Sequence, residues 1–309
     1  MNLILQNDNI LTISDIRKEY HNHTALAGVS LSIPKGSIYG LLGPNGAGKT
    51  SLIRIITQIT GADSGKILFE GEELSPKHIS QIGYLPEERG LYPKMKVGEQ
   101  LIYLGRLKGI PKAEIEKKLK YWLTTFEMKE WWNKEVGGLS KGMQQKVQFV
   151  ATVLHDPKLL ILDEPFSGFD PINANLLKDE ILKLQQKGTT VIFSTHRMES
   201  VEELCDTIAL INKSHKIFEG KKADIKMSHR THIFEVQTDK PISESGNSFA
   251  ILKESKETDF KTYITSVKIN EGVAKNALLQ ELVSDYEIIS MQEKLPSIND
   301  IFIKMVEEK

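Results

Sequence analysis

The sequence has little cysteine, no long uncharged apolar run and no excess of charge of either sign. Its one cysteine, Cys205, cannot form a disulfide within the chain, which fits a reducing compartment. No uncharged apolar stretch approaches the ~18 residues that a membrane-spanning helix needs. The first residues, Met1 to Ile13, lack the cationic start of a signal peptide. We therefore expect a soluble, cytoplasmic protein that cannot itself form a channel.

The charges of the side chains nearly cancel, since 40 basic and 41 acidic groups give a formal charge of -1. A protein that grips nucleic acid usually shows a basic excess or a basic stripe, and neither is visible in this sequence. No nucleic-acid partner is therefore expected. The 309 residues, 40 % of them apolar, are enough for one large domain or two ordinary ones with a sizeable core.

Short aliphatic runs alternate with helical patterns along the first two thirds of the chain. Strands are predicted at residues 10–13, 29–33, 37–42, 66–69, 82–85, 159–162 and 191–194. Helices are predicted over 49–60, over about 172–187, and between about 97 and 155, where the candidates for burial include Ile102, Leu119, Leu123 and Phe126. The alternation favours a mostly parallel sheet covered on both sides, with the helical stretch as a lobe beside it.

The last helix of this lobe has the clearest pattern. Ser140 can cap it, and the chain leaves it at Asp156 and Pro157. One side of the helix is predicted to carry Met143, Val147, Val150, Ala151 and Leu154.

The character of the chain changes after Gly220. Residues 221–230 are polar and basic, as in a linker, and residues 231–309 are predicted to form a small separate unit. Its strands are expected at 233–236, 263–269 and 286–291, and its helices at 273–283 and 297–307. The last helix places on one side Ile298, Ile301, Phe302, Met305 and Val306. We expect this side to pack on the unit's own sheet; pairing of two subunits and bracing of the first domain are the alternatives.

A glycine-rich loop joins a predicted strand to a predicted helix and has the pattern of a phosphate-binding loop. It comprises Gly43, Pro44, Asn45, Gly46, Ala47, Gly48, Lys49 and Thr50, followed by Ser51. Backbone N–H groups of such a loop converge on phosphates, and the N-terminus of the next helix adds partial positive charge. Lys49 is expected to neutralise the β- and γ-phosphate oxygens of ATP, and Thr50 to supply a ligand to Mg²⁺. A chance match to the pattern is the alternative.

Two aliphatic strands end in polar side chains that suit ATP hydrolysis. The first runs into Asp163 and Glu164, and the second runs into His196. The carboxyl ends of parallel strands form the ligand-binding edge of such sheets. Asp163 is therefore expected to contact Mg²⁺ through water, and Glu164 to orient and deprotonate the attacking water. The alternative for this acidic pair is a helix cap.

His196 is a candidate sensor of the γ-phosphate because it follows its strand at this same edge. A lone histidine is more often structural than catalytic, and the other histidines of the chain have no comparable setting.

With these motifs in this order, residues 9 to 220 resemble the ATP-binding subunits of ABC transporters. The resemblance implies that Tyr20 stacks on adenine, although a tyrosine beside a strand is often simply packed there. It also implies that Ser140 and Gly142, in a segment similar to the family's signature, contact the γ-phosphate. Asp170 belongs to the loop after the acidic pair. In the family the signature of one subunit faces the phosphate loop of another, so a homodimer would sandwich two ATP molecules.

The resemblance also implies the fold and the domain boundaries. We expect an α/β fold: a P-loop NTPase parallel sheet with an antiparallel N-terminal sheet and a helical lobe at about residues 94–156. These parts would form an ABC-type ATP-binding domain of residues 1–222. A small α+β accessory domain would follow at residues 231–309.

The chain departs from the family pattern at two places. Lys141 and Met143 stand where the family usually has glycine and glutamine, while Ser140 and Gly142 are kept. Glu87 replaces a glutamine that touches Mg²⁺ and senses the membrane partner. A carboxylate can still ligate Mg²⁺, but it adds a negative charge and loses an N–H donor. Residues 85–92 and 296–302 resemble the subgroup that includes sodium-extruding ATPases.

The resemblance implies a Mg²⁺-dependent ATPase that drives transport, in the direction of export, through separate integral membrane permease subunits. Such a chain would be peripheral at the cytoplasmic face of the plasma membrane. One alternative is a soluble relative that acts on nucleic acid or ribosomes; such proteins generally carry two ATPase units, long coiled coils or basic arms. A catalytically silent regulator is disfavoured because Lys49, Asp163, Glu164 and His196 are all present.

Overall fold

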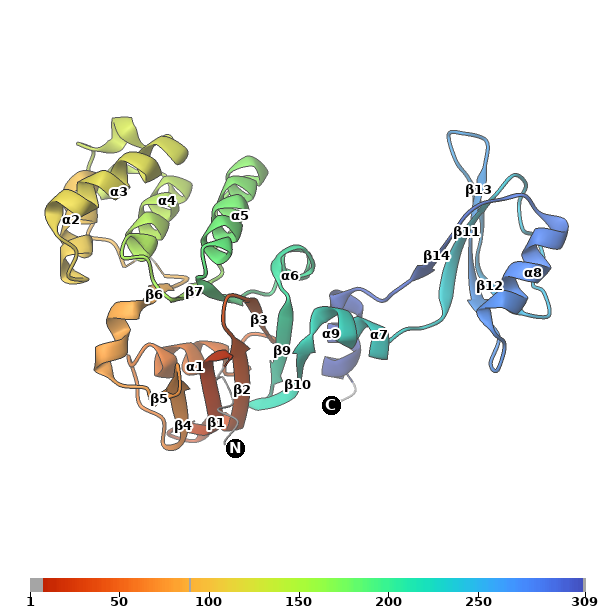
Figure 1. The fold of residues 1–309 in the computed structure, drawn as a ribbon, viewed down its shortest axis with the longest axis horizontal. Coiled ribbons are helices and arrows are strands. Elements are labelled where there is room, and N and C mark those ends of the chain that lie inside the picture. The colour runs from red at the N-terminus through yellow and green to blue at the C-terminus, as the bar shows by residue number, and fades with distance from the viewer. Residues whose placement is uncertain (1–7, 89, 308–309) are drawn as a thin grey trace, which may run out of the picture. The chain divides into compact units, whose positions relative to one another are not determined.

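The computed structural model describes residues 8–88 and 90–307, and these fall into two compact units (Figure 1). One unit extends to Lys222, and the other begins at Ala223. The first contains two sheets and most of the helices, and the second contains one sheet with its own helices. The site residues predicted from the sequence all lie in the first unit.

An antiparallel sheet with the strand order β2-β1-β4-β5 belongs to the first unit. Its strands are β1 Asn9–Tyr20, β2 His23–Pro34, β4 Ser64–Phe69 and β5 Glu72–Glu73. β1 and β2 are longer than predicted because their pairing continues outward to Tyr20 and His23. The register shifts near Asp15, whose φ is 48°, and this irregularity interrupts the alternation that would reveal a strand.

A six-stranded sheet with the order β10-β9-β3-β8-β7-β6 holds the center of the unit. Its strands are β3 Ile38–Leu42, β6 Ile82–Leu85, β7 Leu159–Asp163, β8 Thr190–Ser194, β9 Thr207–Asn212 and β10 His215–Lys221. All neighbours pair in parallel except β9 and β10. Every residue of β3, β7 and β8 is buried, as expected for strands covered on both faces. The predicted α/β fold is confirmed.

Three helices follow strands of this sheet directly. α1 Lys49–Ile56 follows β3, α5 Pro171–Gln186 follows β7, and α6 Met198–Leu204 follows β8. α1 is shorter than the helix predicted over residues 49–60, because the backbone turns to a φ of 57° at Gln58. Ile53 of α1 joins Leu11 and Leu41 in a core shared by both sheets.

The helical lobe lies between β6 and β7 in the sequence. It contains α2 Val97–Leu107, α3 Lys112–Thr125, α4 Lys141–Val153 and the short 3₁₀ turns η2 Lys129–Trp131 and η3 Val136–Gly138; a further turn, η1 Pro76–Gln81, precedes β6. Ser140 caps α4 as predicted, since its hydroxyl accepts the N–H of Met143 at 3.3 Å. Among the described residues no helix combines the length and the apolar character needed to span a membrane.

The side predicted for α4 is buried in part: Val147, Val150 and Leu154 are buried, whereas Met143 and Ala151 are only half-buried. Phe149 and Val153 lie off that side and are fully buried as well. The ring of Phe149 packs edge-on against Trp122 and Phe126, with centroids 5.9 and 5.8 Å apart. α4 is therefore buried on more than one side, and Lys141 at its start is exposed.

The lobe corrects one further expectation about burial. Leu119, Leu123 and Phe126 are buried as predicted. Ile102 is only partly buried, and the adjacent Leu101 takes the core position on α2.

The second unit is built on an antiparallel sheet with the order β12-β13-β11-β14. Its elements are α7 Lys222–Ser228, β11 Ile233–Thr238, β12 Phe249–Glu257, β13 Tyr263–Ile269, α8 Lys275–Asp285, β14 Ile288–Lys294 and α9 Ile298–Glu307. The sequence did not predict β12, and the expected linker at 221–230 is largely the helix α7. Ile225 of α7 is buried, which a solvated linker would not allow.

α9 does not pack as predicted. Ile298 and Ile301 are buried, but the core of the four-stranded sheet is formed with α8 and includes neither of them. α9 instead comes near α7, since the charge of Lys226 contributes to lowering the pKa of the Asp300 carboxyl, after the larger effect of hydrogen bonds from Ser297.

Candidate functional site

The phosphate-loop residues leave β3 and turn into α1. Gly43, Gly46 and Gly48 have φ values of 153°, 79° and 113°, which only glycine adopts readily. A β-carbon on Gly48 would lie 2.3 Å from the carbonyl oxygen of Ala25, and one on Gly43 would lie 2.2 Å from that of Ile211. Both glycines are therefore required by close backbone approach as well as by conformation.

Lys49 points its ammonium group back into the loop. Its Nζ donates to the carbonyl oxygens of Gly43 at 2.7 Å and Pro44 at 3.1 Å, and the residue is only 9 % exposed. Burial lowers the pKa of Lys49, while the carboxylates of Asp163, Glu164 and Glu87 act in the opposite direction. The loop therefore holds a buried cation close to three acidic side chains.

The acidic residues meet at the carboxyl edge of the parallel sheet. Asp163 is the last residue of β7 and is 5 % exposed, and Glu87 follows the neighbouring strand β6. Burial raises the pKa of Asp163, and the negative charges of Glu164 and Glu87 raise it further. This edge therefore concentrates negative charge that a cation would relieve.

The side chains at this edge fit Mg²⁺. Thr50, Asp163 and Glu87 offer oxygen donors, which Mg²⁺ prefers. The pKa of Asp163 is raised mainly by burial, and the smaller part that comes from the charges of Glu164 and Glu87 is repulsion that a divalent ion would offset. Within residues 8–88 and 90–307 no three carboxylate, imidazole or thiol groups gather closely enough to hold a metal by themselves. The protein therefore supplies only some of the Mg²⁺ ligands, and phosphate oxygens and water molecules would supply the others.

Glu164 and His196 are joined by a tight hydrogen-bond network. One carboxylate oxygen of Glu164 accepts the backbone N–H of His196 at 2.8 Å and lies 2.6 Å from its Nδ1. The other accepts the hydroxyl of Thr195 at 3.0 Å. The Glu164 backbone has a φ of 47°, and its N–H donates to the carbonyl of Ser194. A strained backbone with a fully engaged side chain marks a residue held in place for function.

Tyr20 and the phosphate loop line one cavity of about 330 Å³. Its lining comprises Tyr20, His23, Ala25, Asn45, Gly46, Ala47, Gly48, Lys49, Thr50 and Ser51. His23 was missed by the sequence reasoning, which gave a functional setting only to His196. A two-residue turn pairs Tyr20 with His23 across the β1–β2 hairpin, so the register of the hairpin was the missing signal. Lys18 lies 5.4 Å from the centre of the Tyr20 ring.

Ser140, Gly142 and Asp170 do not line this cavity. Ser140 caps α4, and a β-carbon on Gly142 would lie 3.2 Å from the carbonyl oxygen of Gly168. Asp170 caps α5, and hydrogen bonds from Asn173 hold its pKa below the usual value. The structure therefore brings the signature segment against the loop that follows Glu164.

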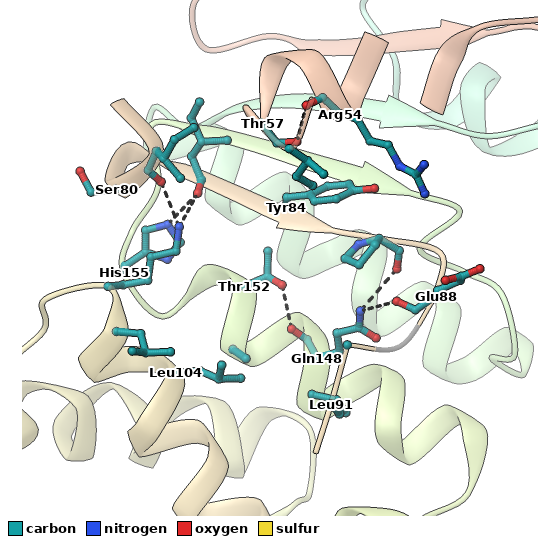
Figure 2. Close-up of a pocket in the computed structure, with 18 residues that line it drawn as sticks. Arg54, Thr57, Ser80, Tyr84, Glu88, Leu91, Leu104, Gln148, Thr152 and His155 are labelled. Atoms are coloured by element: carbon teal, nitrogen blue, oxygen red, sulfur yellow. Dashed lines mark hydrogen bonds between the residues drawn. The ribbon is translucent and has the colours of Figure 1, made fainter. Parts of the chain in front are cut away.

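A larger groove, of about 870 Å³, lies between the parallel sheet and the lobe (Figure 2). Apolar side chains line much of it, among them Ile59, Leu91, Leu104 and Leu107, and polar ones include Arg54, Glu88, Gln148 and His155. Its residues come from four separate stretches of the chain, so no continuous motif in the sequence predicts it. Pro86 and Glu88 flank Glu87 and line the groove, which therefore adjoins the acidic edge.

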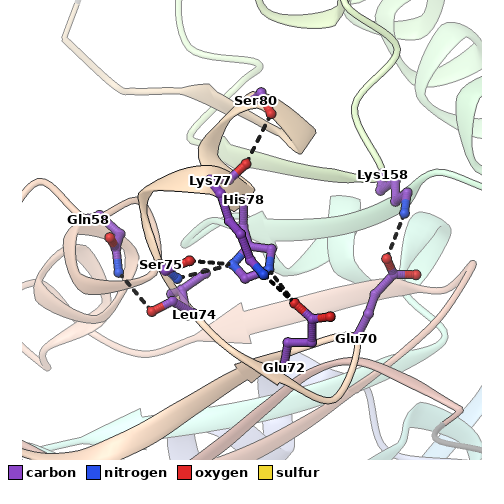
Figure 3. A network of polar contacts seen from close by, with 9 residues as sticks. All are labelled: Gln58, Glu70, Glu72, Leu74, Ser75, Lys77, His78, Ser80 and Lys158. Atoms are coloured by element: carbon purple, nitrogen blue, oxygen red, sulfur yellow. Dashed lines mark hydrogen bonds and ion pairs between the residues drawn. The ribbon is translucent and has the colours of Figure 1, made fainter.

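Another cavity, of about 520 Å³, is lined by charged side chains that form ion pairs and hydrogen bonds with one another. Figure 3 shows part of this polar network. Glu70 pairs with Lys158 at 2.6 Å and Lys35 at 3.3 Å, and Glu72 pairs with Lys77 at 2.6 Å. The ring of His78 accepts the N–H of Ser75 at 3.1 Å. Lys35 and Lys158 precede β3 and β7, so these pairs connect the amino ends of the parallel strands to the antiparallel sheet.

Comparison with family models matches two parts of the chain. Residues 26–167 match the model described as ABC transporter. Residues 220–306 match the model described as ATP-binding protein DrrA1-3-like, C-terminal domain.

Comparison with individual proteins extends over nearly the whole chain. The ABC transporter ATP-binding protein YhaQ of Bacillus subtilis is 41 % identical over 298 residues, which cover 96 % of this chain and 98 % of YhaQ. NatA of Bacillus subtilis, also an ABC transporter ATP-binding protein, is 35 % identical and covers 72 % of this chain and 94 % of its own length. A solved ATP-binding subunit of an ABC transporter is 30 % identical with a TM-score of 0.68, over 71 % of this chain and 92 % of that one.

Proposed function

Because the chain belongs to the family of ABC transporter ATP-binding proteins, we propose that it is the Mg²⁺-dependent motor of a transporter, dimerising around two ATP molecules. Residues 85–92 and 296–302 resemble the subgroup that includes sodium-extruding ATPases, and on that basis we propose export as the direction. Residues 1–222 would be the ATP-binding domain, with the lobe at about 94–156, and residues 231–309 an accessory domain.

The observation that carries this proposal is the cavity shared by Tyr20 and the phosphate loop. Adenine would stack on the half-exposed Tyr20 ring, with His23 beside it across the hairpin. The phosphates would lie along residues 43–51, where loop N–H groups and the start of α1 favour an anion. Lys49 would exchange its two carbonyl partners for phosphate oxygens.

The hydrolytic step is assigned to the acidic edge. Thr50, Asp163 and Glu87 would hold Mg²⁺, which when bound neutralises charge on the β- and γ-phosphates. Glu164 would orient a water for in-line attack and accept its proton. The Nδ1 of His196 lies 2.6 Å from a carboxylate oxygen of Glu164 and the side chain is largely exposed, so it can turn toward the γ-phosphate once ATP is bound.

The second half of each site would come from another subunit. Ser140, Gly142 and Asp170 are absent from the lining of the chain's own nucleotide cavity, although the family resemblance assigns them to ATP. A homodimer in which the start of α4 faces the partner's phosphate loop reconciles the two observations. Each of two ATP molecules would then be bound between the subunits.

The groove beside Glu87 is proposed as the docking site for integral membrane permease subunits. It is large, open and lined by exposed apolar side chains such as Leu107 and Ile59. Docking there would place the chain at the cytoplasmic face of the plasma membrane. It would also put the permease next to the Mg²⁺ ligands, where occupancy of the groove and ATP hydrolysis can influence each other.

Phosphate release by the purified chain tests the proposal. ATP hydrolysis should require Mg²⁺ and cease in EDTA. Lys49→Ala should weaken ATP binding as well as hydrolysis, because the ammonium group meets the phosphates before reaction too. Equal nucleotide affinities of parent and variant in a fluorescence titration would contradict the role of Lys49. Isolation of the chain from membranes in mild detergent should yield a permease, and recovery of nucleic acid or ribosomes in its place would overturn the transport assignment.

A further inference from the structure

Two glutamines on α4 reach out of the lobe to the loops that carry the acidic residues. Gln145 and Gln148 lie three positions apart, hence on the same side of the helix, and are 2 % and 5 % exposed. Burying a carboxamide costs free energy unless it is hydrogen-bonded. The hydrogen-bond partners of these two glutamines therefore show which backbone segments they fix in place.

Gln148 holds the backbone on both sides of Glu87 (Figure 2). Its Nε2 donates to the carbonyl oxygen of Pro86 at 3.4 Å and to that of Glu88 at 3.3 Å. Both carbonyls can only accept, so the NH₂ end must face them, and its two hydrogens suffice for both. The residue between these anchor points is the one proposed to ligate Mg²⁺.

Gln145 makes the matching contact to the other acidic loop. Its Nε2 donates at 3.4 Å to the carbonyl oxygen of Pro165, directly after Glu164. Ser140 caps the start of the same helix, eight residues before Gln148. α4 thus contacts both the Glu87 loop and the Glu164 loop, and its start carries Ser140, which is proposed to face the second subunit.

We propose that Gln148 is a positioning residue for ATP hydrolysis, holding Glu87 at the distance from Asp163 that Mg²⁺ requires. The inference rests on the proposed role of Glu87 as a Mg²⁺ ligand. The metal site is an open set of few protein donors, so a loose Glu87 loop lowers Mg²⁺ affinity more than it lowers the affinity for ATP alone.

Gln148 also lines the groove proposed for the permease, and its Oε1 is buried with no hydrogen-bond partner among the described residues. Anything that displaces this carboxamide from the groove side releases both carbonyls at once. Gln148 is therefore the side chain through which occupancy of the groove moves Glu87.

The test compares two glutamine-to-leucine variants of the same helix. Gln148→Leu replaces the carboxamide by methyl groups and removes both hydrogen bonds to the Glu87 loop. Gln144→Leu is the matched control, because Gln144 also donates to two carbonyls, those of Val136 and Leu139 at 3.1 Å, away from that loop. Both variants lose comparable hydrogen bonding, so a general loss of stability affects them alike.

Three measurements separate positioning from stability. In Gln148→Leu the Mg²⁺ concentration for half-maximal hydrolysis should rise roughly tenfold, as expected for two lost hydrogen bonds, with kcat recovering at excess Mg²⁺. The ratio of nucleotide Kd in EDTA to that in Mg²⁺ should fall by a similar factor. Hydrogen exchange at the amides of Glu87 and Glu88 should quicken. Gln144→Leu should change none of the three.

Equal Mg²⁺ dependence and equal exchange in both variants would overturn the inference. A parent chain that binds nucleotide but does not hydrolyse it would contradict the proposed function instead, while the Kd ratio and the exchange rates would still decide the role of Gln148. If Gln148→Leu does not fold, Gln148→Met is unbranched and has the length of glutamine but lacks the NH₂ group, so the same shifts are expected from it.

Discussion

His155 follows α4 and lines the groove, and its environment keeps the imidazole neutral. Its Nε2 is 3.2 Å from the carbonyl oxygen of Ile82, which can only accept, so Nε2 carries the proton. Nδ1 is buried without a partner among the described residues. Burial, and then the nearby charge of Lys108, lower the pKa of His155 to about 4.

This lowered pKa predicts a specific loss of stability in acid. Between pH 6.5 and about 4 the unfolded chain protonates His155 and the folded chain does not, so the free energy of unfolding falls as the pH falls. The loss from this one group is at most about 3 kcal/mol. In His155→Gln, which can still donate to Ile82, this contribution should be absent. Urea unfolding at pH 7, 5 and 4 measures it, and parallel pH profiles for both proteins would contradict the prediction.

Glu164→Gln should keep ATP affinity and lose turnover at least 10²-fold, because a glutamine of the same shape cannot accept the proton of the attacking water. The variant should also accumulate an ATP-dependent dimer, since closure precedes hydrolysis. Phosphate release and size-exclusion chromatography with ATP give the two readouts. Turnover above about a tenth of the parent rate would show that another group is the base.

Among the elements, the aliphatic strands were the easiest to predict. β7 and β8 begin and end within one residue of the predicted bounds, because a run of buried aliphatic residues leaves little choice of structure. The long strands β1 and β2 were underestimated, since their pairing depends on a bulge and a tight turn that a propensity pattern does not show. The sequence predicts a linker at α7 because this helix is short and Ile225 is its buried residue, which is too little to show a helical pattern.

The residues of the candidate site also differ in whether the sequence predicts them. The loop at 43–50 and the acidic strand end could be recognised because each motif is continuous in the sequence. His23 and Gln148 could not, since their relevance comes from partners that are distant in the chain: the hairpin register for His23 and the Pro86 and Glu88 carbonyls for Gln148. The placement of such residues is a property of the tertiary structure.

The start of α4 gives a prediction at the scale of the element. If Ser140 reaches ATP on a second subunit, Ser140→Arg should leave ATP binding to the monomer intact and prevent dimer closure. Arginine also removes a helix cap worth about 1 kcal/mol, so a second variant is needed. Ser140→Asp keeps a capping oxygen and confronts the partner's phosphates with a carboxylate; it should fold like the parent and still fail to close.

Mixing the Ser140→Arg and Lys49→Ala proteins extends this prediction. A heterodimer of the two can contain at most one intact composite site, so it should bind a single ATP in the closed state. Equilibrium centrifugation with labelled ATP measures the stoichiometry. Normal dimerisation together with normal turnover in Ser140→Arg would exclude the sandwich arrangement for this chain.

For the whole molecule, a chain shortened to end at Ala223 should fold and hydrolyse ATP. Every residue assigned to ATP lies between Tyr20 and His196, and Lys222 is still tied to the first unit by its N–H to the Asp206 carbonyl at 2.9 Å. The division between the two units falls at this same place. The ATPase rate and melting temperature of the shortened and full chains show whether the first unit folds and hydrolyses ATP by itself.

A cut at Ser214 is the control for that experiment. It removes β10, and with it Glu219, whose carboxylate accepts the N–H of Ser32 at 2.7 Å and the hydroxyl of Tyr39 at 2.8 Å. This shorter chain should be insoluble. If the chain ending at Ala223 is insoluble too, or binds ATP without hydrolysing it, the accessory unit belongs to the motor.

The left-handed backbone at Glu164 has a consequence for anyone who selects this protein for heat resistance. A residue with a β-carbon at a φ of 47° is disfavoured by roughly 1–2 kcal/mol, a strain that glycine would relieve. Glycine would also lose the hydrogen bonds that join the Glu164 carboxylate to Thr195 and His196, and these together outweigh the strain. Random mutagenesis scored only on survival of heating should therefore leave Glu164 unchanged, and enrichment of Glu164→Gly would show that the strain is the larger of the two.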